Sequence, residues 1–375
     1  MKTDLSPKHI CTVDETSILW FQQSNRYVVV SESLFSLIQL YLSVESKALF
    51  TSTLNDSLSI EADRCSTIYD EITIFLKDAI TVPNETPKPR TSLNIPIDTI
   101  TKSYNINGVG IEINFESKHL ESLIHPQISH YQTKNNLEHP IVFDIFRTDD
   151  LLHFFKNKSH VASYTTKMAH FLQGKFALEL TNTVHNTDIE KWIATFHAST
   201  VSNEKEAIMI IGDSGNGKST LSALLMTKGF DVFADDFTPL YQDMNLYRYP
   251  SAISIKKGAF DMLASELENF NTLKTYSNGP KKVNLKYIPN DAKESKTKLP
   301  CQKIVLVKYD QSQASELKAI SLENILETLI PDSWISPNDA HALQFLNWLK
   351  TVQCFELNYS DNDFAIAKFK TLFDS

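Results

Sequence analysis

The alternation of hydrophobic and polar residues along the chain predicts a mixed α/β protein. Short apolar runs with period two, bounded by turn residues, favour strands, and apolar residues at helical spacing favour helices. An Asn107-Gly108 pair between two such runs is typical of a hairpin turn. Strands are expected at 18–21, 27–30, 103–107, 111–115, 141–146, 160–165, 176–180, 195–201, 206–211, 230–234, 303–308 and 354–359, and helices at 33–42, 62–79, 120–124, 151–155, 322–329, 339–349 and 362–373.

Prolines and polar residues between 81 and 96 predict a linker, because this stretch has almost nothing apolar to bury. We therefore expect a small α+β module of winged-helix-like layout at 1–80 and a larger domain at 97–375. The module contains no catalytic set of residues, so its expected role is binding or packing. In the larger domain, the first strands look mostly antiparallel, which favours a mixed sheet over repeated βαβ units.

Three of the chain's nine glycines fall in one short segment that matches the phosphate-loop pattern G-x-x-x-x-G-K-[ST]. The buried strand expected at 206–211 precedes it, and leucines at helical spacing follow it as far as Gly229. A glycine turn that binds nothing is the alternative. The strand–loop–helix context favours a nucleotide-binding segment made of Gly212, Asp213, Ser214, Gly215, Asn216, Gly217, Lys218, Ser219 and Thr220.

Phosphoryl transfer needs positioned positive charge, a metal and a base, and the segments around the loop offer all three. Lys218 would pair with the β- and γ-phosphates of ATP or GTP, and Ser219 would bind Mg²⁺. Asp235 and Asp236 end the next expected strand, whose carboxyl end should lie beside the loop. One carboxylate can bind Mg²⁺ while the other accepts the proton of an attacking hydroxyl. The alternative is a solvated strand end or a helix cap.

His197 and several lysines are further candidates. The strand expected at 195–201 could direct His197 into the same site, although a histidine on an apolar strand is often a hydrogen-bonded core residue. Most of the lysines between 281 and 303 are expected to face solvent. The functional alternative is that Lys256, Lys257 or Lys286 reaches the γ-phosphate or an acidic substrate.

Composition narrows the class of protein. The 375-residue chain has a formal net charge of −9, so general binding to nucleic acid is not expected. No apolar run reaches the length of a membrane helix, and the first residues lack a signal-peptide core. The cysteines are far apart and form no CxxC pair, as expected of free thiols in a reducing cytoplasm: Cys11, Cys65, Cys301 and Cys354.

The segment from His197 through the glycine loop to Asp236 resembles the catalytic core of HPr kinase/phosphorylase. It is more similar still to the HPr-kinase-related proteins of peptide-modification gene clusters. The shared marks are a His-(hydrophobic)-Ser lead-in, the G-D-S-G-x-G-K-S loop and the Asp-Asp strand end. The resemblance implies a phosphoenolpyruvate-carboxykinase-like P-loop fold. It also implies that Asp235 is the acid/base, that Asp236 lies on the metal side, and that His197 contacts phosphate or acceptor.

The chain also departs from that family. The bifunctional enzyme has a Glu-x-Arg-Gly signature after the aspartates, and the nearest match here, 254–258, lacks the glutamate and has lysine for arginine. Phosphorolysis is therefore not expected. The N-terminal module is similar in layout to PqqD-like precursor-peptide recognition domains, with a plain packing domain as the alternative. Kinases of the family often assemble, so homo-oligomerisation is an expectation as well.

Together these features predict an ATP-dependent (or GTP-dependent), Mg²⁺-requiring kinase. Its expected acceptor is a hydroxyl, that of a serine in a peptide or small protein, with Asp235 as general base. A kinase for free serine or a sugar-like alcohol is one alternative. A nucleotide-binding regulatory or assembly protein that transfers no phosphate to a substrate is another. The sequence does not name the acceptor.

Overall fold

The computed structural model describes residues 2–82, 95–278, 283–290 and 296–374. The chain forms two compact units, each built from two stretches of sequence. One consists of Met1–Asn84 with Ser321–Val352, and the other of Glu85–Ile320 with Gln353–Ser375. The linker expected at 81–96 lies almost wholly outside the described residues.

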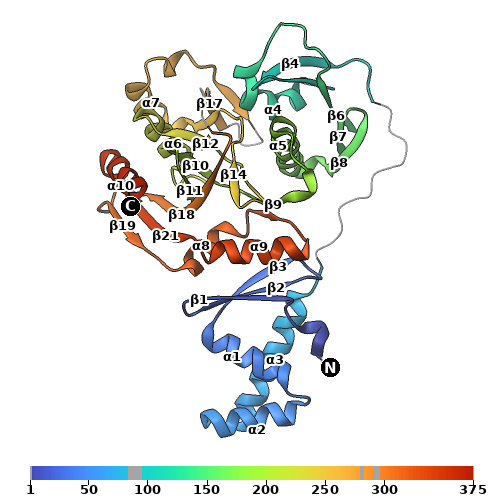
Figure 1. Ribbon diagram of the computed structural model, residues 1–375, viewed down its shortest axis with the longest axis vertical. Coiled ribbons are helices and arrows are strands. Elements are labelled where there is room, and N and C mark those ends of the chain that lie inside the picture. The colour runs from blue at the N-terminus through green and yellow to red at the C-terminus, as the bar shows by residue number, and fades with distance from the viewer. Residues whose placement is uncertain (1, 83–94, 279–282, 291–295, 375) are drawn as a thin grey trace. The chain divides into compact units, whose positions relative to one another are not determined.

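The N-terminal stretch of the first unit is an antiparallel sheet, in the order β1-β2-β3, followed by helices (Figure 1). All the strands and helices expected in this stretch are present. The sequence pattern did not predict β1 and α2; in α2 only Phe50 and Leu54 are buried, so its apolar stripe is narrow. The elements are β1 (His9–Val13), β2 (Thr16–Phe21), β3 (Arg26–Ser31), α1 (Glu32–Ser43), α2 (Lys47–Leu58) and α3 (Ala62–Ala79).

The same unit includes a segment from near the other end of the chain, with α8 (Leu322–Leu329), β20 (Trp334–Ile335) and α9 (Asp339–Leu349). Helix α9 packs on the N-terminal sheet: the Cys11 thiol donates to Leu346 O at 3.3 Å, and the Tyr27 and Phe345 rings meet edge to face at 5.3 Å. Residues 321–352, expected in the larger domain, thus belong to the compact unit of the N-terminal module. Sequence pattern alone does not show which sheet an apolar helix covers.

The second unit begins with a sheet in the order β4-β5-β6-β7-β8, in which only the β5–β6 pair is parallel. The expected hairpin is confirmed, with Asn107 and Gly108 both at positive φ in its turn. The elements are β4 (Ile100–Ile106), β5 (Val109–Phe115), α4 (Lys118–Ile128), β6 (Ile141–Thr148), β7 (Leu151–Lys156), β8 (Ser159–Thr165) and α5 (Ala169–His185).

Two expectations in this region are wrong. Residues 151–155, expected as a helix, form strand β7, and residues 176–180, expected as a strand, lie inside helix α5. Both runs are buried on all sides, β7 between two neighbouring strands and this part of α5 in the core. A short run of apolar residues has the same appearance in a buried strand and in a buried helix, so its length and pattern do not separate the two.

The largest sheet of the unit contains the glycine loop, in the strand order β12-β10-β11-β18-β14-β13-β9, with β21 beside β18 and β19 beside β21. It is mixed: β11, β18 and β21 run parallel, while β10 lies antiparallel between β11 and β12. Its strands are β9 (Trp192–Phe196), β10 (Ser199–Ser202), β11 (Ala207–Ile211), β12 (Asp231–Ala234), β13 (Thr238–Tyr241), β14 (Asn245–Tyr247), β18 (Lys298–Tyr309), β19 (Glu316–Ala319) and β21 (Gln353–Tyr359).

This topology brings five chain segments to one edge of the sheet. Because β11, β12, β18 and β21 share a direction, their carboxyl ends lie together, and the start of the opposed β10 joins them. Helix α6 packs on β10 and β12 (Figure 1). A small antiparallel sheet, β15-β17-β16, also contacts α6. The additional elements are α6 (Lys218–Thr227), β15 (Ile253–Lys256), α7 (Phe260–Glu266), β16 (Tyr276–Asn278), β17 (Val283–Ile288) and α10 (Asn362–Asp374).

The expected strand at 195–201 is in fact two strands. Residues 192–196 pair with β13, whereas 199–202 pair with β11 and β12, and the break falls at His197 and Ala198. The amide of Ala198 donates to Phe196 O at 2.9 Å, which closes a tight turn. His197 therefore lies in a turn at the edge of the sheet rather than on a strand.

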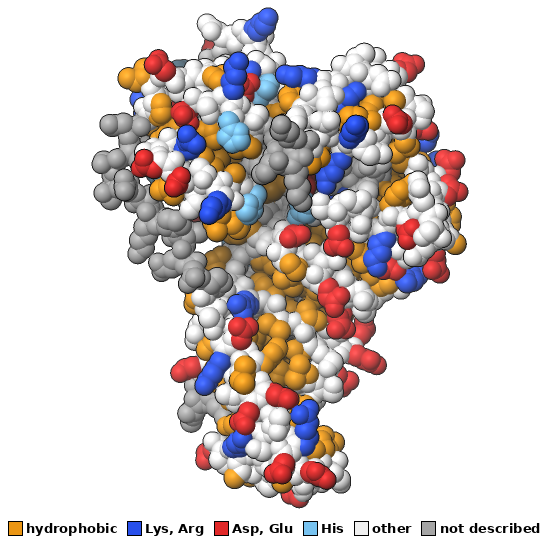
Figure 2. All heavy atoms as spheres, turned by 180° about the vertical axis from the view of Figure 1, so that it is seen from behind, with side chains coloured by type: hydrophobic (Ala, Val, Ile, Leu, Met, Phe, Trp, Pro, Cys, Tyr) orange, Lys and Arg blue, Asp and Glu red, His pale blue; other side chains and the backbone are white. Residues whose placement is uncertain are grey.

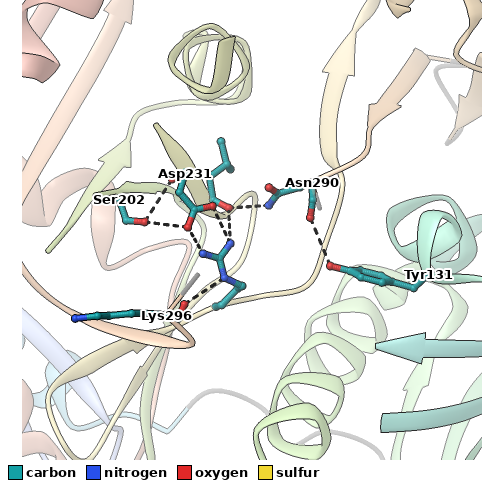
Figure 3. Close-up of polar contacts among 7 residues, drawn as sticks. Tyr131, Ser202, Asp231, Asn290 and Lys296 are labelled. Carbon is teal, nitrogen blue, oxygen red and sulfur yellow. Dashed lines mark hydrogen bonds and ion pairs between the residues drawn. The ribbon is translucent and has the colours of Figure 1, made fainter. Parts of the chain in front are cut away.

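An ion pair between a buried arginine and a half-buried aspartate anchors the other end of β12 (Figure 3). The guanidinium of Arg248, only 4% exposed, donates to both carboxylate oxygens of Asp231 and, at 3.0 Å, to Val232 O. Asn290 also donates to Val232 O, at 2.7 Å. Removing one partner of such a pair leaves a buried charge uncompensated. The contacts thus fix the strand that carries the paired aspartates.

The charged surface residues, the helices and the cysteines match what the composition predicted. On the face shown in Figure 2, acidic and basic side chains are interspersed. None of the helices in the described part of the chain combines the length and apolar character needed to cross a bilayer. The four cysteines are all buried and none forms a disulfide, as expected: Cys11, Cys65, Cys301 and Cys354.

Candidate functional site

The glycine loop connects β11 to α6 in a conformation that two of its glycines make possible. Gly212 has φ +152°, and a Cβ there would lie 2.7 Å from the backbone oxygen of Val307. Gly217 has φ +89°, and its Cβ would lie 2.9 Å from the Tyr359 hydroxyl. The loop therefore passes directly over the ends of β18 and β21. It ends in the first turn of α6, whose free N–H groups form a site for phosphate.

Replacing Gly212 with alanine is expected to lower the free energy of unfolding by about 1–3 kcal/mol, because the new methyl group meets a backbone oxygen that cannot rotate away. Gly174, inside helix α5, is the matched control. A Cβ there meets nothing within 4 Å, so Gly174→Ala should stabilise the protein by about 0.5–1 kcal/mol. Urea denaturation of both variants measures the difference; shifts of the same sign would contradict the description of the loop.

Lys218 is a buried cation facing the start of its own loop. Its ammonium donates to Gly212 O at 2.6 Å and to Asp213 O at 3.4 Å, and the residue is only 7% exposed. Burial lowers the pKa of Lys218, and the nearby carboxylates of Asp236 and Asp235 oppose that shift. An ammonium that donates to backbone carbonyls can transfer those hydrogen bonds to phosphate oxygens, so the residue fits the predicted role.

Asp235 is a buried carboxylate held by donors from two other strands. Its Oδ1 accepts from the Ser199 hydroxyl at 2.6 Å, and its Oδ2 accepts from the Ser254 N–H at 3.0 Å. Burial raises the pKa of Asp235 to about 6, the charge of Asp236 adds to the rise, and hydrogen bonds, including one from Ser219, partly oppose it. A carboxyl that titrates near neutrality is suited to general base catalysis.

Asp236 lies next to it but in a different environment. Its backbone has φ +65°, which turns the chain at the end of β12, and its side chain is 61% exposed. The Asp236 Oδ1 is 3.1 Å from Nδ1 of His197. The structure thus brings together the three residues expected to act with the loop, although His197 does so from a turn. The two aspartates differ sharply in burial.

Two donors to Asp235 were not predicted as site residues, whereas Lys256 and Lys286 were among the candidate lysines. Ser199, part of the His-(hydrophobic)-Ser mark, binds Asp235. Ser254 contributes only its backbone N–H, which no residue-type signal could reveal. Lys256 donates to the Ser214 hydroxyl at 2.9 Å, whereas Lys286 is buried and donates to Phe270 O at 2.9 Å. Lysine composition could not distinguish these two environments.

The residues fit a Mg²⁺ site of the kind that depends on the nucleotide. Among the described residues, no group of three or more His, Cys, Asp or Glu side chains could hold a metal alone. Mg²⁺ in nucleotide sites is bound by one or two carboxylates together with phosphate oxygens and waters. The exposed carboxylate of Asp236 and the hydroxyl of Ser219, at the first turn of α6, offer protein ligands of this type.

Comparisons with known proteins give a partial structural match. No protein-family model matches the sequence, and no curated protein matches it. Among solved structures, the Hpr(Ser) kinase/phosphatase from Coxiella burnetii aligns with 47% of this chain and 88% of its own, at 11% sequence identity and a TM-score of 0.24. A match of this size carries no weight for the reaction or the substrate, which must follow from the chain's own residues.

Proposed function

We propose that this protein is a kinase that transfers the γ-phosphate of ATP or GTP to a hydroxyl group, that of a serine in a peptide or small protein. One observation carries the proposal: a buried carboxylate with a raised pKa, Asp235, lies at the same sheet edge as the phosphate loop and its Lys218. A loop that only bound nucleotide would not need a base beside it.

In the proposed reaction, Lys218 and the N–H groups of the loop bind and orient the β- and γ-phosphates. The acceptor oxygen forms a bond to the γ-phosphorus, and the bond from that phosphorus to the bridging oxygen breaks, so that the nucleoside diphosphate leaves with the electron pair. The hydroxyl proton moves to a carboxylate oxygen of Asp235. Mg²⁺, when bound with Ser219 and Asp236, supplies neutralisation of phosphate charge.

Asp235 retains the capacity to accept that proton. A carboxylate has about four acceptor positions. The hydrogen bonds from the Ser199 hydroxyl, the Ser254 N–H and the Ser219 hydroxyl leave about one of them free. His197, whose Nδ1 is 3.1 Å from Asp236 Oδ1, would contact phosphate or acceptor. An alternative assignment exchanges the roles of the two aspartates. The exposed Asp236 would then be the base, and Asp235, beside Ser219, would lie on the metal side.

The remaining parts of the proposal concern fold and partners. We assign the second unit to the phosphoenolpyruvate-carboxykinase-like P-loop class, on the strength of the antiparallel β10 beside β11 and the mixed sheet. The small sheet and helices of the first unit would hold the peptide or protein that carries the acceptor, in the manner of PqqD-like domains. A homo-oligomer is proposed on the resemblance alone.

Intact-mass measurement after incubation with ATP, Mg²⁺ and a serine-containing peptide tests the reaction. A gain of one phosphate on the peptide supports the proposal. Phosphate transferred to free serine or a sugar-like alcohol instead would identify a small-molecule kinase. Nucleotide hydrolysis or binding without any modified acceptor would contradict the proposal and indicate a regulatory protein.

The rate of phosphoryl transfer should depend on the ionisation of Asp235. Because its pKa is about 6, the carboxyl is protonated at lower pH and cannot accept the acceptor's proton. We therefore expect kcat/KM to rise with pH up to about 6 and then to level off, with a roughly tenfold loss per pH unit below that point. The acidic limb should persist in His197→Asn, whereas a limb that vanishes in this variant would assign it to the imidazole.

A further inference from the structure

The contacts of Lys218 locate the γ-phosphate end of the loop. The lysine of a phosphate loop reaches the β- and γ-phosphates. Here its ammonium lies against Gly212 O and Asp213 O, at the beginning of the loop rather than near α6. The terminal phosphate is therefore expected beside residues 212–214, a stretch that includes Ser214.

Strand β15 directs alternate side chains toward this end of the loop. Ile253 and Ile255 are fully buried in the core of the unit, so Ser254 and Lys256 share the opposite face of the strand. The Ser254 N–H donates to Asp235, and the Lys256 ammonium donates to the Ser214 hydroxyl at 2.9 Å. One short strand thus contacts both the proposed base and the start of the phosphate loop.

Lys256 differs in its contacts from Lys257 and Lys286, the other two candidate lysines. Lys286 is 7% exposed, and its ammonium is bound to Phe270 O and lies 4.8 Å from the centre of the Phe270 ring. Lys257 is exposed and follows the strand, at the start of the short helical turn Lys257–Ala259. Lys256 is exposed and close enough to Lys218 that its charge contributes to the lowered pKa of that lysine, after the larger effect of burial.

We infer that Lys256 is a γ-phosphate ligand, the second cation of the site, and that it distinguishes nucleoside triphosphate from diphosphate. In the free protein its ammonium is held by the Ser214 hydroxyl. A bound triphosphate brings a charged oxygen to the same place, and an ammonium–phosphate hydrogen bond is stronger than one to a neutral hydroxyl. A diphosphate leaves that place empty. This inference rests on the proposed nucleotide site, not on the identity of the acceptor.

Calorimetric titration with ATP and with ADP, each in the presence of Mg²⁺, tests this inference. Lys256→Met should weaken ATP binding about tenfold or more while changing ADP binding by less than about twofold. Lys257→Met is the matched control, expected to leave both affinities within about twofold. Lys256→Arg should restore most of the preference for ATP, because it keeps the charge.

Two results would overturn the inference: equal loss of ATP and ADP affinity in Lys256→Met, or no loss of either. Both are measured without an acceptor, so they are independent of the peptide phosphorylation assay. If the wild-type protein phosphorylates the peptide while Lys256→Met keeps its preference for ATP, the inference fails and the proposed kinase stands. If no acceptor is modified but the preference for ATP depends on Lys256, the inference stands and the proposed kinase function fails. If the wild-type protein binds neither nucleotide, both fail.

Discussion

Replacing Asp235 with asparagine is expected to lower kcat for phosphoryl transfer at least about 100- to 1,000-fold while leaving the affinity for ATP within about threefold. The expected loss is that of a general base. The geometry predicts that the site survives the change. The asparagine oxygen can accept from the Ser254 N–H, which is always a donor, and the amide can donate to Ser199, whose hydroxyl rotates.

The same substitution should stabilise the folded protein above pH 6. The pKa of Asp235 is raised from 3.8 to about 6, so the folded state binds the proton more tightly than the unfolded chain does. The stability that this group contributes is therefore fully present below about pH 4 and is lost as the pH rises to about 6. Asparagine is neutral throughout, so its advantage, on the order of 3 kcal/mol, should appear at pH 7.5 and not at pH 4. Thermal denaturation at both values tests this.

Two further variants serve as controls for the effect of Asp235→Asn on kcat. Asp261→Asn makes the same chemical change on the exposed first turn of α7 and should leave kcat unchanged. Asp236→Asn should instead weaken the dependence of ATP binding on Mg²⁺. If Asp235→Asn abolishes that dependence while Asp236→Asn removes the acidic limb of the pH profile, the roles of the two aspartates are exchanged.

Replacing Lys218 with methionine is expected to weaken ATP binding about 100-fold, because the β- and γ-phosphates lose their buried positive charge. The fold should tolerate the change: methionine has a similar length, and burial already disfavours the charged form of Lys218. Because two hydrogen bonds to backbone carbonyls are lost, we expect a folded variant whose melting temperature is somewhat below that of the wild type. Nucleotide titration combined with thermal denaturation measures both effects.

Lys286→Met is the matched control for that experiment, since Lys286 is also a buried lysine bonded to backbone carbonyls. Its ammonium lies over the rings of Phe260 and Phe270, away from the loop contacts of Lys218. The control should lose stability, by roughly 1–3 kcal/mol, without a specific loss of ATP affinity. Equal losses of ATP affinity in the two variants would contradict the assignment of Lys218 to the phosphates.

The parts of the site that the sequence predicted are those that depend on local chemistry. The glycine loop must have glycine where a Cβ would strike the backbone of Val307 or the Tyr359 hydroxyl, and its lysine and serine follow at fixed spacing. The strands on either side are short, mostly apolar runs. Residue type and order were therefore sufficient to place the loop, Asp235 and Asp236 at one sheet edge.

The parts that were not predicted depend on tertiary structure. The turn at His197 exists because residues before and after it pair with different strands, which cannot be seen in an apolar run. The contact from Ser254 uses a backbone group common to almost every residue. The choice of Lys256 over Lys286 depends on which lysine the β15–β17 pair directs outward and which it buries.

The first unit has a consequence for how the chain folds during synthesis. Its sheet is made before the second unit, but α9, which contacts that sheet through Cys11 and Tyr27, is made more than 300 residues later. The apolar surface that α9 covers must stay exposed until that helix has been made. All of the second unit except its last strand and helix is synthesised during this interval. A premature stop before residue 321 would thus damage the N-terminal module as well.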